Sequence, residues 1–597
     1  MAAHRDENKR SPLKTWVRAL ERTAAIERDR SLTLPALIGR LGERFGDAPA
    51  LISLDSQLSY RELAAACHRY ARWGLASGLS RGDTVCLVMA NCPDYMAIWL
   101  GLSAIGVTVA LINTNLRGAL LAHSLNLVAP RHLIVDASLS EAVRAVRPSL
   151  HPAVECWLSG AAHAGLPGID EELAKLSGEP LRVSELAAPP TLEDRALCIY
   201  TSGTTGLPKA ANVSHYRLMQ WSHWFAGLID VQPEDRMYDC LPMYHSVGGV
   251  VATGATLVGG GAVVLRERFS ASGFWRDVIA EHCTLFQYIG ELCRYLLASP
   301  PQEKESQHAL RLACGNGLRA EVWGEFQQRF RIPQILEYYA ATEGNFSLYN
   351  CEGRPGAIGR VPPFLAHRLP VAVVKFDLAA GEPVRDASGR CVRCAPNERG
   401  EAIGQILDTH GSTRFEGYTD EAASSKKILR NVFAPGDAWY RTGDLMRQDE
   451  QGFFYFVDRV GDTFRWKGEN VSTAEVAGVI AGCPGVVDAA VYGVSVPGTD
   501  GRAGMAALVT GEGFELAALR RALQERLPAY ARPLFLRIVA AIELTGTFKL
   551  RTLELALEGF DPARVRDDLY IDDGERNEYV RLDARLHEQL RAGMLRL

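Results

Sequence analysis

The chain has 597 residues, of which 47% are hydrophobic and 23% are charged, and its formal net charge at pH 7 is −5. This length exceeds what one ordinary hydrophobic core fills, so we expect a globular protein of at least two domains. The small net charge argues against a nucleic-acid partner. Thirteen cysteines are scattered along the chain, and without a secretory signal we expect reduced thiols in a cytoplasm.

Up to about residue 350, short β-type runs alternate with amphipathic helical stretches. The β-type runs are DTVCLVMA (83–90), VTVALI (107–112), RHLIVD (131–136) and GAVVLRER (261–268). The helical stretches are RELAAACHRYARWGLAS (61–77), EAVRAVRPSL (141–150) and GFWRDVIAEHC (273–283). Such alternation is typical of layered α/β structure with largely parallel sheets.

Residues 95–112, YMAIWLGLSAIGVTVALI, are long and apolar enough to imitate a membrane span. The pattern changes at Gly106 from helical to β-branched residues, which predicts a buried helix followed by a buried strand. Residues 249–265 are similarly apolar, but their glycine run argues against a stable span. With no lipid-anchor motif either, we expect a cytoplasmic protein, for which peripheral contact with the inner face of the cell membrane stays open.

Beyond residue 350 the pattern changes twice. Short strands and turns up to residue 457, such as GEAIGQIL (400–407), predict a small β-rich subdomain. After residue 460, runs such as VVDAAVYGVSV (486–496) and FELAALRRALQERL (514–527) predict a compact α+β domain. The last forty residues are dense in charge, and we expect them to form a solvated segment. The predicted fold class is therefore α/β plus α+β.

Residues 200–209 read YTSGTTGLPK, a loop of small hydroxyl residues and glycines that ends in a lysine. A β-rich run precedes this loop and a helical pattern follows it, which is how α/β proteins hold phosphates. The alternative is a plain surface turn. The spacing does not fit the P-loop of kinases and GTPases, because Lys209 is followed by Ala210 rather than by Ser or Thr.

Five further stretches follow in a fixed order. They are CGNGLRAEVW (314–323), YYAATEGN (338–345), YRTGDL (440–445), DRVGDTFRWKGENVS (458–472) and LTGTFKL (544–550). The first has a GxGxxA outline, which alone is weak evidence for a dinucleotide site. Only ten of the 65 basic residues are lysines. The use of lysine rather than arginine at Lys209 of YTSGTTGLPK and Lys549 of LTGTFKL therefore suggests a task for a compact ammonium group.

Together with YTSGTTGLPK, these stretches resemble the adenylate-forming superfamily of acyl-CoA synthetases, luciferases and peptide-synthetase adenylation domains. The resemblance covers about residues 35 to 560. FQYIGELCRYLL (286–297), EYYAATEGN (337–345) and TGTFKL (545–550) narrow it to the fatty acid transport protein branch, also called very-long-chain acyl-CoA synthetases.

The resemblance implies an N-terminal adenylation domain over residues 1–457 and a small mobile C-terminal domain over residues 458–597, with a hinge at Asp458. It also implies two half-reactions: a fatty acid attacks the α-phosphate of ATP, and CoA then displaces AMP from the acyl-adenylate. Mg²⁺ is the implied metal. Three alternatives stay open: a sterol or bile-type acid substrate, fatty acid transport either without chemistry or with uptake coupled to activation, and loading of a carrier protein.

The site residues are likewise implied by the resemblance. Those expected around the phosphates are Tyr200, Thr201, Ser202, Gly203, Thr204, Thr205, Gly206 and Lys209. Those expected around the adenine are Gly315, Asn316, Gly317, Tyr338 and Tyr339. Ala340 departs from the superfamily's usual glycine and is expected to tighten the site.

The remaining roles concern catalysis and motion. Thr342 is expected to bind the α-phosphate and Glu343 to hold Mg²⁺, while His245 is expected near the acyl carbonyl. A further set contains Asp444 for the ribose, Arg459 for ribose or phosphate, Gly468 for the CoA path and Lys549 for the adenylation step.

Overall fold

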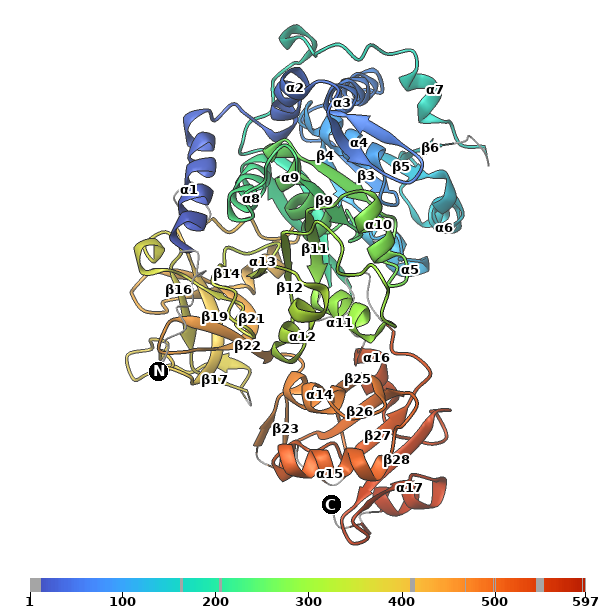
Figure 1. Cartoon of the computed structure of the whole chain (residues 1–597), viewed down its shortest axis with the longest axis vertical. Helices are drawn as coiled ribbons and strands as arrows, with labels where there is room; N and C mark the ends of the chain where they lie inside the picture. Colours follow the sequence, from blue (N-terminus) through green and yellow to red (C-terminus); the bar gives the residue numbers. More distant parts are fainter. Residues whose placement is uncertain are drawn as a thin grey trace. The chain divides into compact units, whose positions relative to one another are not determined.

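The computed structural model describes residues 12–160, 165–202, 207–378, 380–407, 414–467, 469–497, 499, 501–543, 552–592, 594 and 595. The chain divides into two compact units, and their helices and strands are labelled in Figure 1. The first contains residues 1–369 and 406–428, and the second contains residues 370–405 and 429–597. This division describes which parts of the chain are compact. The expected boundary between residues 457 and 458 instead describes which part moves, so it stays a prediction.

A six-stranded sheet of the first unit has the order β6-β5-β3-β4-β7-β8. Its strands are β3 (Thr84–Val88), β4 (Thr108–Leu111), β5 (His132–Asp136), β6 (Glu155–Ser159), β7 (Arg195–Ser202) and β8 (Pro208–Ser214). The first five are parallel, and β8 pairs antiparallel with β7.

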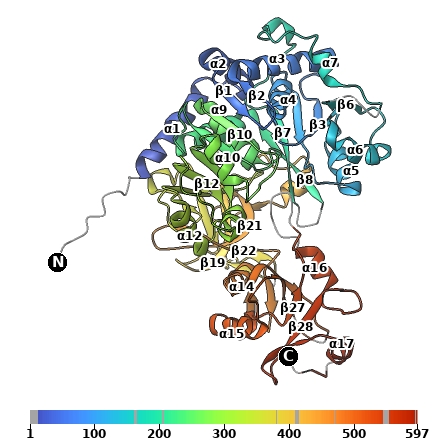
Figure 2. The ribbon, with the colours of Figure 1, turned by 45° about the vertical axis from the view of Figure 1, so that its right-hand side comes forward.

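Helices cover both faces of this sheet. They include α3 (Tyr60–Ala76), α4 (Pro93–Ser103), α5 (Gly118–Leu127) and α6 (Ser140–Val146). Because side chains alternate along a strand, Val85 and Leu87 join the core with α3 and α4, whereas Cys86 and Val88 join the core with α5 and α6. Helix α5 also lies against β8 (Figure 2).

The second sheet of this unit runs in the order β15-β14-β13-β12-β11-β9-β10-β1-β2. Its strands are β1 (Pro49–Ile52), β2 (Gln57–Ser59), β9 (Arg236–Asp239), β10 (Ala262–Leu265), β11 (Leu285–Ile289), β12 (Leu312–Asn316), β13 (Ile335–Ala340), β14 (Ser347–Asn350) and β15 (Gly359–Arg360). Helices around it are α2 (Leu34–Phe45), α8 (His215–Leu228), α9 (Ala255–Gly259), α10 (Phe274–Ala280), α11 (Gly290–Ala298) and α12 (Ala320–Phe330). The predicted layered α/β architecture is confirmed.

The apolar run at residues 95–112 is a buried helix and a buried strand, as its change of pattern predicts. Helix α4 ends at Ser103, Gly106 has φ of +80°, and β4 begins at Thr108. None of the helices in the described ranges has the length and apolarity needed to cross a membrane.

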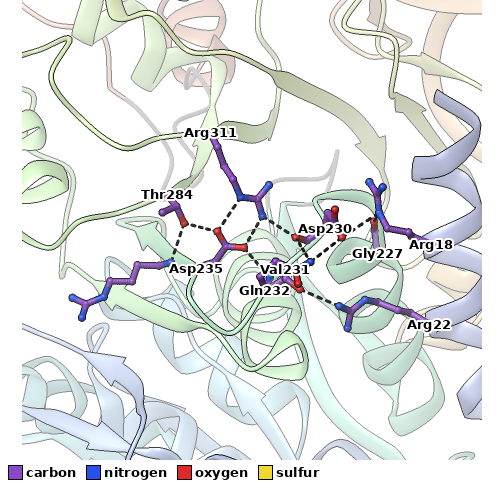
Figure 3. Close-up of polar contacts among 10 residues, drawn as sticks. Arg18, Arg22, Gly227, Asp230, Val231, Gln232, Asp235, Thr284 and Arg311 are labelled. Atoms are coloured by element: carbon purple, nitrogen blue, oxygen red, sulfur yellow. Dashed lines mark hydrogen bonds and ion pairs between the residues drawn. The ribbon is translucent and has the colours of Figure 1, made fainter. Parts of the chain in front are cut away.

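Helix α1 (Pro12–Arg28) packs along α8 and is attached to its C-terminal end (Figure 3). The Arg18 guanidinium donates to the carbonyl of Gly227 and pairs with Asp230, and Arg22 donates to the carbonyl of Val231. These arginines supply donors and positive charge where the last helix carbonyls lack intrahelical partners.

The second unit contains short strands and an α+β part. The strands β16 (Val371–Val374), β19 (Arg399–Ile406), β21 (Ala438–Gln448) and β22 (Phe453–Arg459) lie side by side in that order. Smaller elements are β17 (Phe376–Asp377), β18 (Glu382–Pro383), β23 (Phe464–Trp466) and β24 (Glu469–Val471). The sheet of the α+β part is built from β25 (Val486–Val494), β26 (Ala503–Thr510), β27 (Phe535–Ile538), β28 (Asp568–Asp573) and β29 (Glu578–Arg581).

The helices of this part are α14 (Thr473–Ala481), α15 (Leu516–Arg526), α16 (Thr552–Glu558) and α17 (Ala584–Arg591). The expectation of a solvated segment at the C-terminal end is wrong. Leu569 and Ile571 on β28, Tyr579 on β29 and Leu590 on α17 belong to the core of this part. The charged residues occupy the outward-facing positions of these short strands. A count of composition shows their charge but not the alternation of buried and exposed residues along each strand.

Candidate active site

The glycine-rich motif forms a β-hairpin. Strands β7 and β8 pair so that Thr201 lies opposite Lys209. Gly203, Thr204, Thr205 and Gly206, which connect the two strands along the chain, lie outside the described residues, as does the side chain of Ser202. The expectation that a helix directly follows the loop is wrong, because β8 intervenes before α8. Buried Ala211 and Val213 alternate with partly exposed Asn212, which is the period of a strand.

Two tyrosines expected near the nucleotide have their rings in the core. Tyr200 is buried, and its hydroxyl donates to the carbonyl of Ser124. Tyr338 is buried against Phe225, with ring centroids 4.7 Å apart. Only the backbone of these two positions is left for a nucleotide. Tyr339, on the opposite face of β13, is partly exposed and therefore suits a stacking role.

The expected adenine loop begins within β12, to which Gly315 and Asn316 belong, and continues at Gly317. It is built on close backbone contacts. A Cβ atom at Gly315 would lie 2.2 Å from the carbonyl oxygen of Tyr288, and Gly317 has φ of +80°. Both positions therefore require glycine.

Glu337, which motif reasoning missed, holds this loop from β13. Its carboxyl accepts hydrogen bonds from the N–H groups of Gly317 and Leu318 and from the Tyr288 hydroxyl. Burial raises its pKa to about 8, although these hydrogen bonds lower it. The available signal was a carboxyl residue inside an apolar β-type run, at the third position of β13 (Ile335–Ala340).

Thr342 and Glu343 lie in the loop after β13. The Thr342 hydroxyl is 3.3 Å from that of Ser246, and its carbonyl accepts a hydrogen bond of 2.9 Å from Arg217. The Glu343 side chain is almost buried, and the Tyr418 hydroxyl donates to its Oε1 atom at 2.7 Å. The loop therefore places the Glu343 carboxylate next to the Thr342 hydroxyl along the chain. Both groups are hard oxygen donors of the kind that Mg²⁺ prefers.

His245 precedes a π-helix (η4, Val247–Gly254). Its ring contacts that of Tyr244 edge to face, with centroids 4.6 Å apart. The neighbouring Ser246 contacts Thr342 as described above, so the chain around His245 lies beside the Thr342 loop. Short π-helical segments are frequent at functional sites.

A cavity of about 50 Å³ opens between α8 and the loop that follows Glu343. Its lining is rich in aromatic side chains and consists of Tyr216, Arg217, Gln220, Trp221, Trp224, Gly344, Asn345, Ser347, Tyr349, Leu369 and Glu416.

In the second unit, Asp444 and Arg459 face each other on β21 and β22. The Arg459 guanidinium lies 3.6 Å from the Asp444 carboxylate. Asp444 is buried, whereas the Arg459 side chain is 43% exposed. The pair therefore presents an acceptor and a donor to a ligand, the combination that ribose hydroxyls and phosphates require.

Asp458, the expected hinge, is tied to the residues that follow it. Its buried carboxylate accepts hydrogen bonds from the Thr463 hydroxyl at 2.9 Å and from the N–H group of Thr473 at 2.7 Å. Burial raises its pKa, and the hydrogen bonds oppose that effect. The hinge role itself stays a prediction, as do the roles of Gly468 and Lys549, which lie outside the described residues.

These layered sheets, with a glycine-rich hairpin and an adjacent Thr-Glu loop, are features of the adenylate-forming class of enzymes. The chain belongs to the AMP-binding enzyme family, whose model matches residues 40–401. The model of the AMP-binding enzyme C-terminal domain matches residues 475–549.

The chain is 41% identical over 569 residues to the long-chain fatty acid transport protein 1 of Mus musculus, covering 94% of this chain and 88% of the relative. It is 39% identical over 554 residues to the medium/long-chain-fatty-acid–CoA ligase FadD6 of Mycobacterium tuberculosis, covering 92% and 89%.

Among solved structures, the anthranilate CoA ligase AuaEII with anthranoyl-AMP has a TM-score of 0.75 at 19% identity, covering 89% of this chain and 98% of that one. The fatty acyl CoA synthetase of Mycobacterium tuberculosis has a TM-score of 0.63 at 22% identity, covering 88% and 98%. These two similarities confirm the fold.

Proposed function

We propose that the chain is an AMP-forming fatty acid:CoA ligase. The observation that carries the proposal is that two motif regions of the first unit contact the same side chain. The hairpin of Thr201 and Lys209 and the Thr342–Glu343 loop both contact Tyr418. The 39% sequence identity to FadD6, over a match that covers 92% of the chain, supports a fatty acid as substrate.

ATP is the proposed nucleotide, and its phosphates bind at the hairpin. The Lys209 ammonium balances negative charge that develops on the departing pyrophosphate, and the Thr342 hydroxyl donates to the α-phosphate. The fatty acid carboxylate attacks that phosphorus. The bond from the α-phosphorus to the bridging oxygen breaks, which gives acyl-adenylate and pyrophosphate.

The donor set of the Thr342–Glu343 loop fits Mg²⁺. Mg²⁺ is usually held by one or two carboxylates together with substrate phosphates, and Glu343 supplies one carboxylate. Within the described ranges no group of three or more His, Cys, Asp or Glu side chains forms a metal cage. A bound Mg²⁺ would draw its further ligands from the substrate phosphates. Bound there, Mg²⁺ would neutralise phosphate charge.

Ribose binding is assigned to Asp444, which accepts hydrogen bonds from the hydroxyls, with Arg459 as a donor to ribose or phosphate. In the second half-reaction the CoA thiolate attacks the acyl carbonyl and AMP leaves. Gly468 lines the proposed path for CoA, and Lys549 acts in the first half-reaction only. A rotation of the C-terminal domain about the hinge at Asp458 separates the two steps.

The test measures both half-reactions with the full chain, ATP, Mg²⁺ and a series of fatty acids from medium to very long chain length, plus a sterol acid. Pyrophosphate release and acyl-adenylate without CoA, followed by an acyl-CoA thioester when CoA is added, would support the proposal. A thioester on a carrier protein alone, or fatty acid binding without pyrophosphate release, would overturn it. The ratio of rates along the series identifies the preferred acid.

A further inference from the structure

Tyr418 lies on a segment, residues 414–419, that joins the edge of the phosphate hairpin. The N–H group of Asn212 donates to the carbonyl of Gly417 at 2.9 Å, and that of Thr419 donates to the carbonyl of Ala210 at 2.8 Å. Tyr418 itself forms an antiparallel bridge with Ala211 on β8. Backbone pairing therefore fixes the position of Tyr418 beside the hairpin.

The Tyr418 side chain contacts three residues that the proposed function uses. Its hydroxyl donates to Glu343 Oε1 at 2.7 Å and accepts a hydrogen bond from the Thr201 hydroxyl. The Lys209 ammonium lies over its ring, 5.6 Å from the centroid.

We propose that Tyr418 is a positioning residue that orients Glu343 toward the metal and Lys209 toward the phosphates. This inference rests on the proposed function. A hydrogen bond to one carboxylate oxygen fixes the orientation of a metal ligand before the metal binds. The negative face of the ring likewise orients an ammonium group.

Tyr418 also contacts two groups of opposite charge, Lys209 and Glu343. In the part of the chain that the structure describes, Lys209 forms no ion pair with a carboxylate, and the Tyr418 side chain contacts both Lys209 and Glu343. A direct Lys209–Glu343 pair would neutralise the charges that the phosphates and the metal require.

Buried polar contacts hold this segment and the Thr342 loop together. The Glu416 carboxylate accepts hydrogen bonds from the N–H and hydroxyl groups of Ser214 and lies 3.6 Å from Arg217. The Arg217 guanidinium donates to the carbonyls of both Thr342 and Arg414. The distance between Tyr418 and Glu343 is therefore fixed by the fold before any ligand binds, which is the arrangement that precise positioning requires.

The first experiment compares Tyr418→Phe with Tyr60→Phe. Tyr60 is a matched control, because its buried hydroxyl donates to the carbonyls of Leu257 and Gly261 in the core. For Tyr418→Phe we expect the Mg²⁺ concentration that gives half-maximal adenylation to rise about tenfold, the lower end of the range for a residue that orients a metal ligand. Calorimetry should show weaker ATP binding with Mg²⁺ and unchanged ATP binding without it. Tyr60→Phe should change neither quantity.

A double variant and a variant that removes the ring give two further tests of these contacts. In a Glu343→Gln background, Tyr418→Phe should have little additional effect on Mg²⁺ dependence, since residues that act through one contact are not additive. Tyr418→Leu removes the ring as well, and should raise the KM for ATP in a way that excess Mg²⁺ does not restore.

An unchanged Mg²⁺ dependence in Tyr418→Phe, or additive effects in the double variant, would overturn the inference. Failure of the proposed function gives a different result. A wild-type chain that binds Mg²⁺ and ATP without forming acyl-adenylate would refute the ligase proposal, and the calorimetric comparison would still test Tyr418.

Discussion

Replacing Glu343 by glutamine tests the metal assignment with little change of shape. Glutamine keeps the size of the side chain and an oxygen that accepts the Tyr418 hydroxyl, while the negative charge is lost. Two unit charges about 4 Å apart at an effective dielectric constant of about 20 interact by about 4 kcal/mol. Part of this is recovered by water and phosphate, so we expect adenylation to fall at least about a hundredfold, which corresponds to about 2.7 kcal/mol.

The assay is ATP–pyrophosphate exchange over a Mg²⁺ titration, with Glu321→Gln, an exposed residue of α12, as the charge control. The deficit of Glu343→Gln should be largest at low Mg²⁺, and its melting temperature should match that of the wild type. Exchange close to the wild-type rate at ordinary Mg²⁺ concentrations would refute the reasoning.

Three other variants test separate parts of the account. Lys549→Ala should slow acyl-adenylate formation by about a hundredfold to a thousandfold, yet convert synthetic acyl-adenylate to acyl-CoA at close to the normal rate; Lys304→Ala is the control, and equal damage to both steps would mean misfolding. Asp458→Pro should fix φ and spare adenylation while thioester formation stalls, whereas Asp458→Asn should allow both steps; a parallel loss of both in Asp458→Pro would remove the support for a hinge. Glu337 has a pKa raised to about 8, so its contribution to stability is present below its unfolded pKa and is lost as pH rises toward 8. As the pH rises toward 8, the free energy of unfolding of the wild type should therefore fall relative to that of Glu337→Gln in denaturant titrations. Parallel pH profiles of the two proteins would contradict the assignment.

Local patterns predicted the layered fold because they carry the periods of helix and strand. The change at Gly106 separated α4 from β4, and the alternation of apolar runs predicted the parallel strands. Strand β8 was missed because the glycine loop suggested a helix directly after it. The packed C-terminal strands were missed because charged residues dominate the composition of that segment.

The site was predictable where motifs carry it and unpredictable where distant segments meet. Thr342 and Glu343 stand in one short motif, whereas Tyr418 lies 75 residues from Glu343 along the chain. No spacing rule connects the two, since their contact depends on residues 414–419 pairing with β8. Glu337 also contacts a loop that only the parallel pairing of β12 with β13 brings near.

Transfer of oxygen from the acid to AMP tests the central claim most directly. A fatty acid labelled with ¹⁸O in both carboxyl oxygens is incubated with the full chain, ATP, Mg²⁺ and CoA, and the products are analysed by mass spectrometry. If the carboxylate attacks the α-phosphate, each AMP carries one labelled oxygen and the acyl-CoA keeps the other. Unlabelled AMP, or label in phosphate released with ADP, would contradict adenylation by this chain.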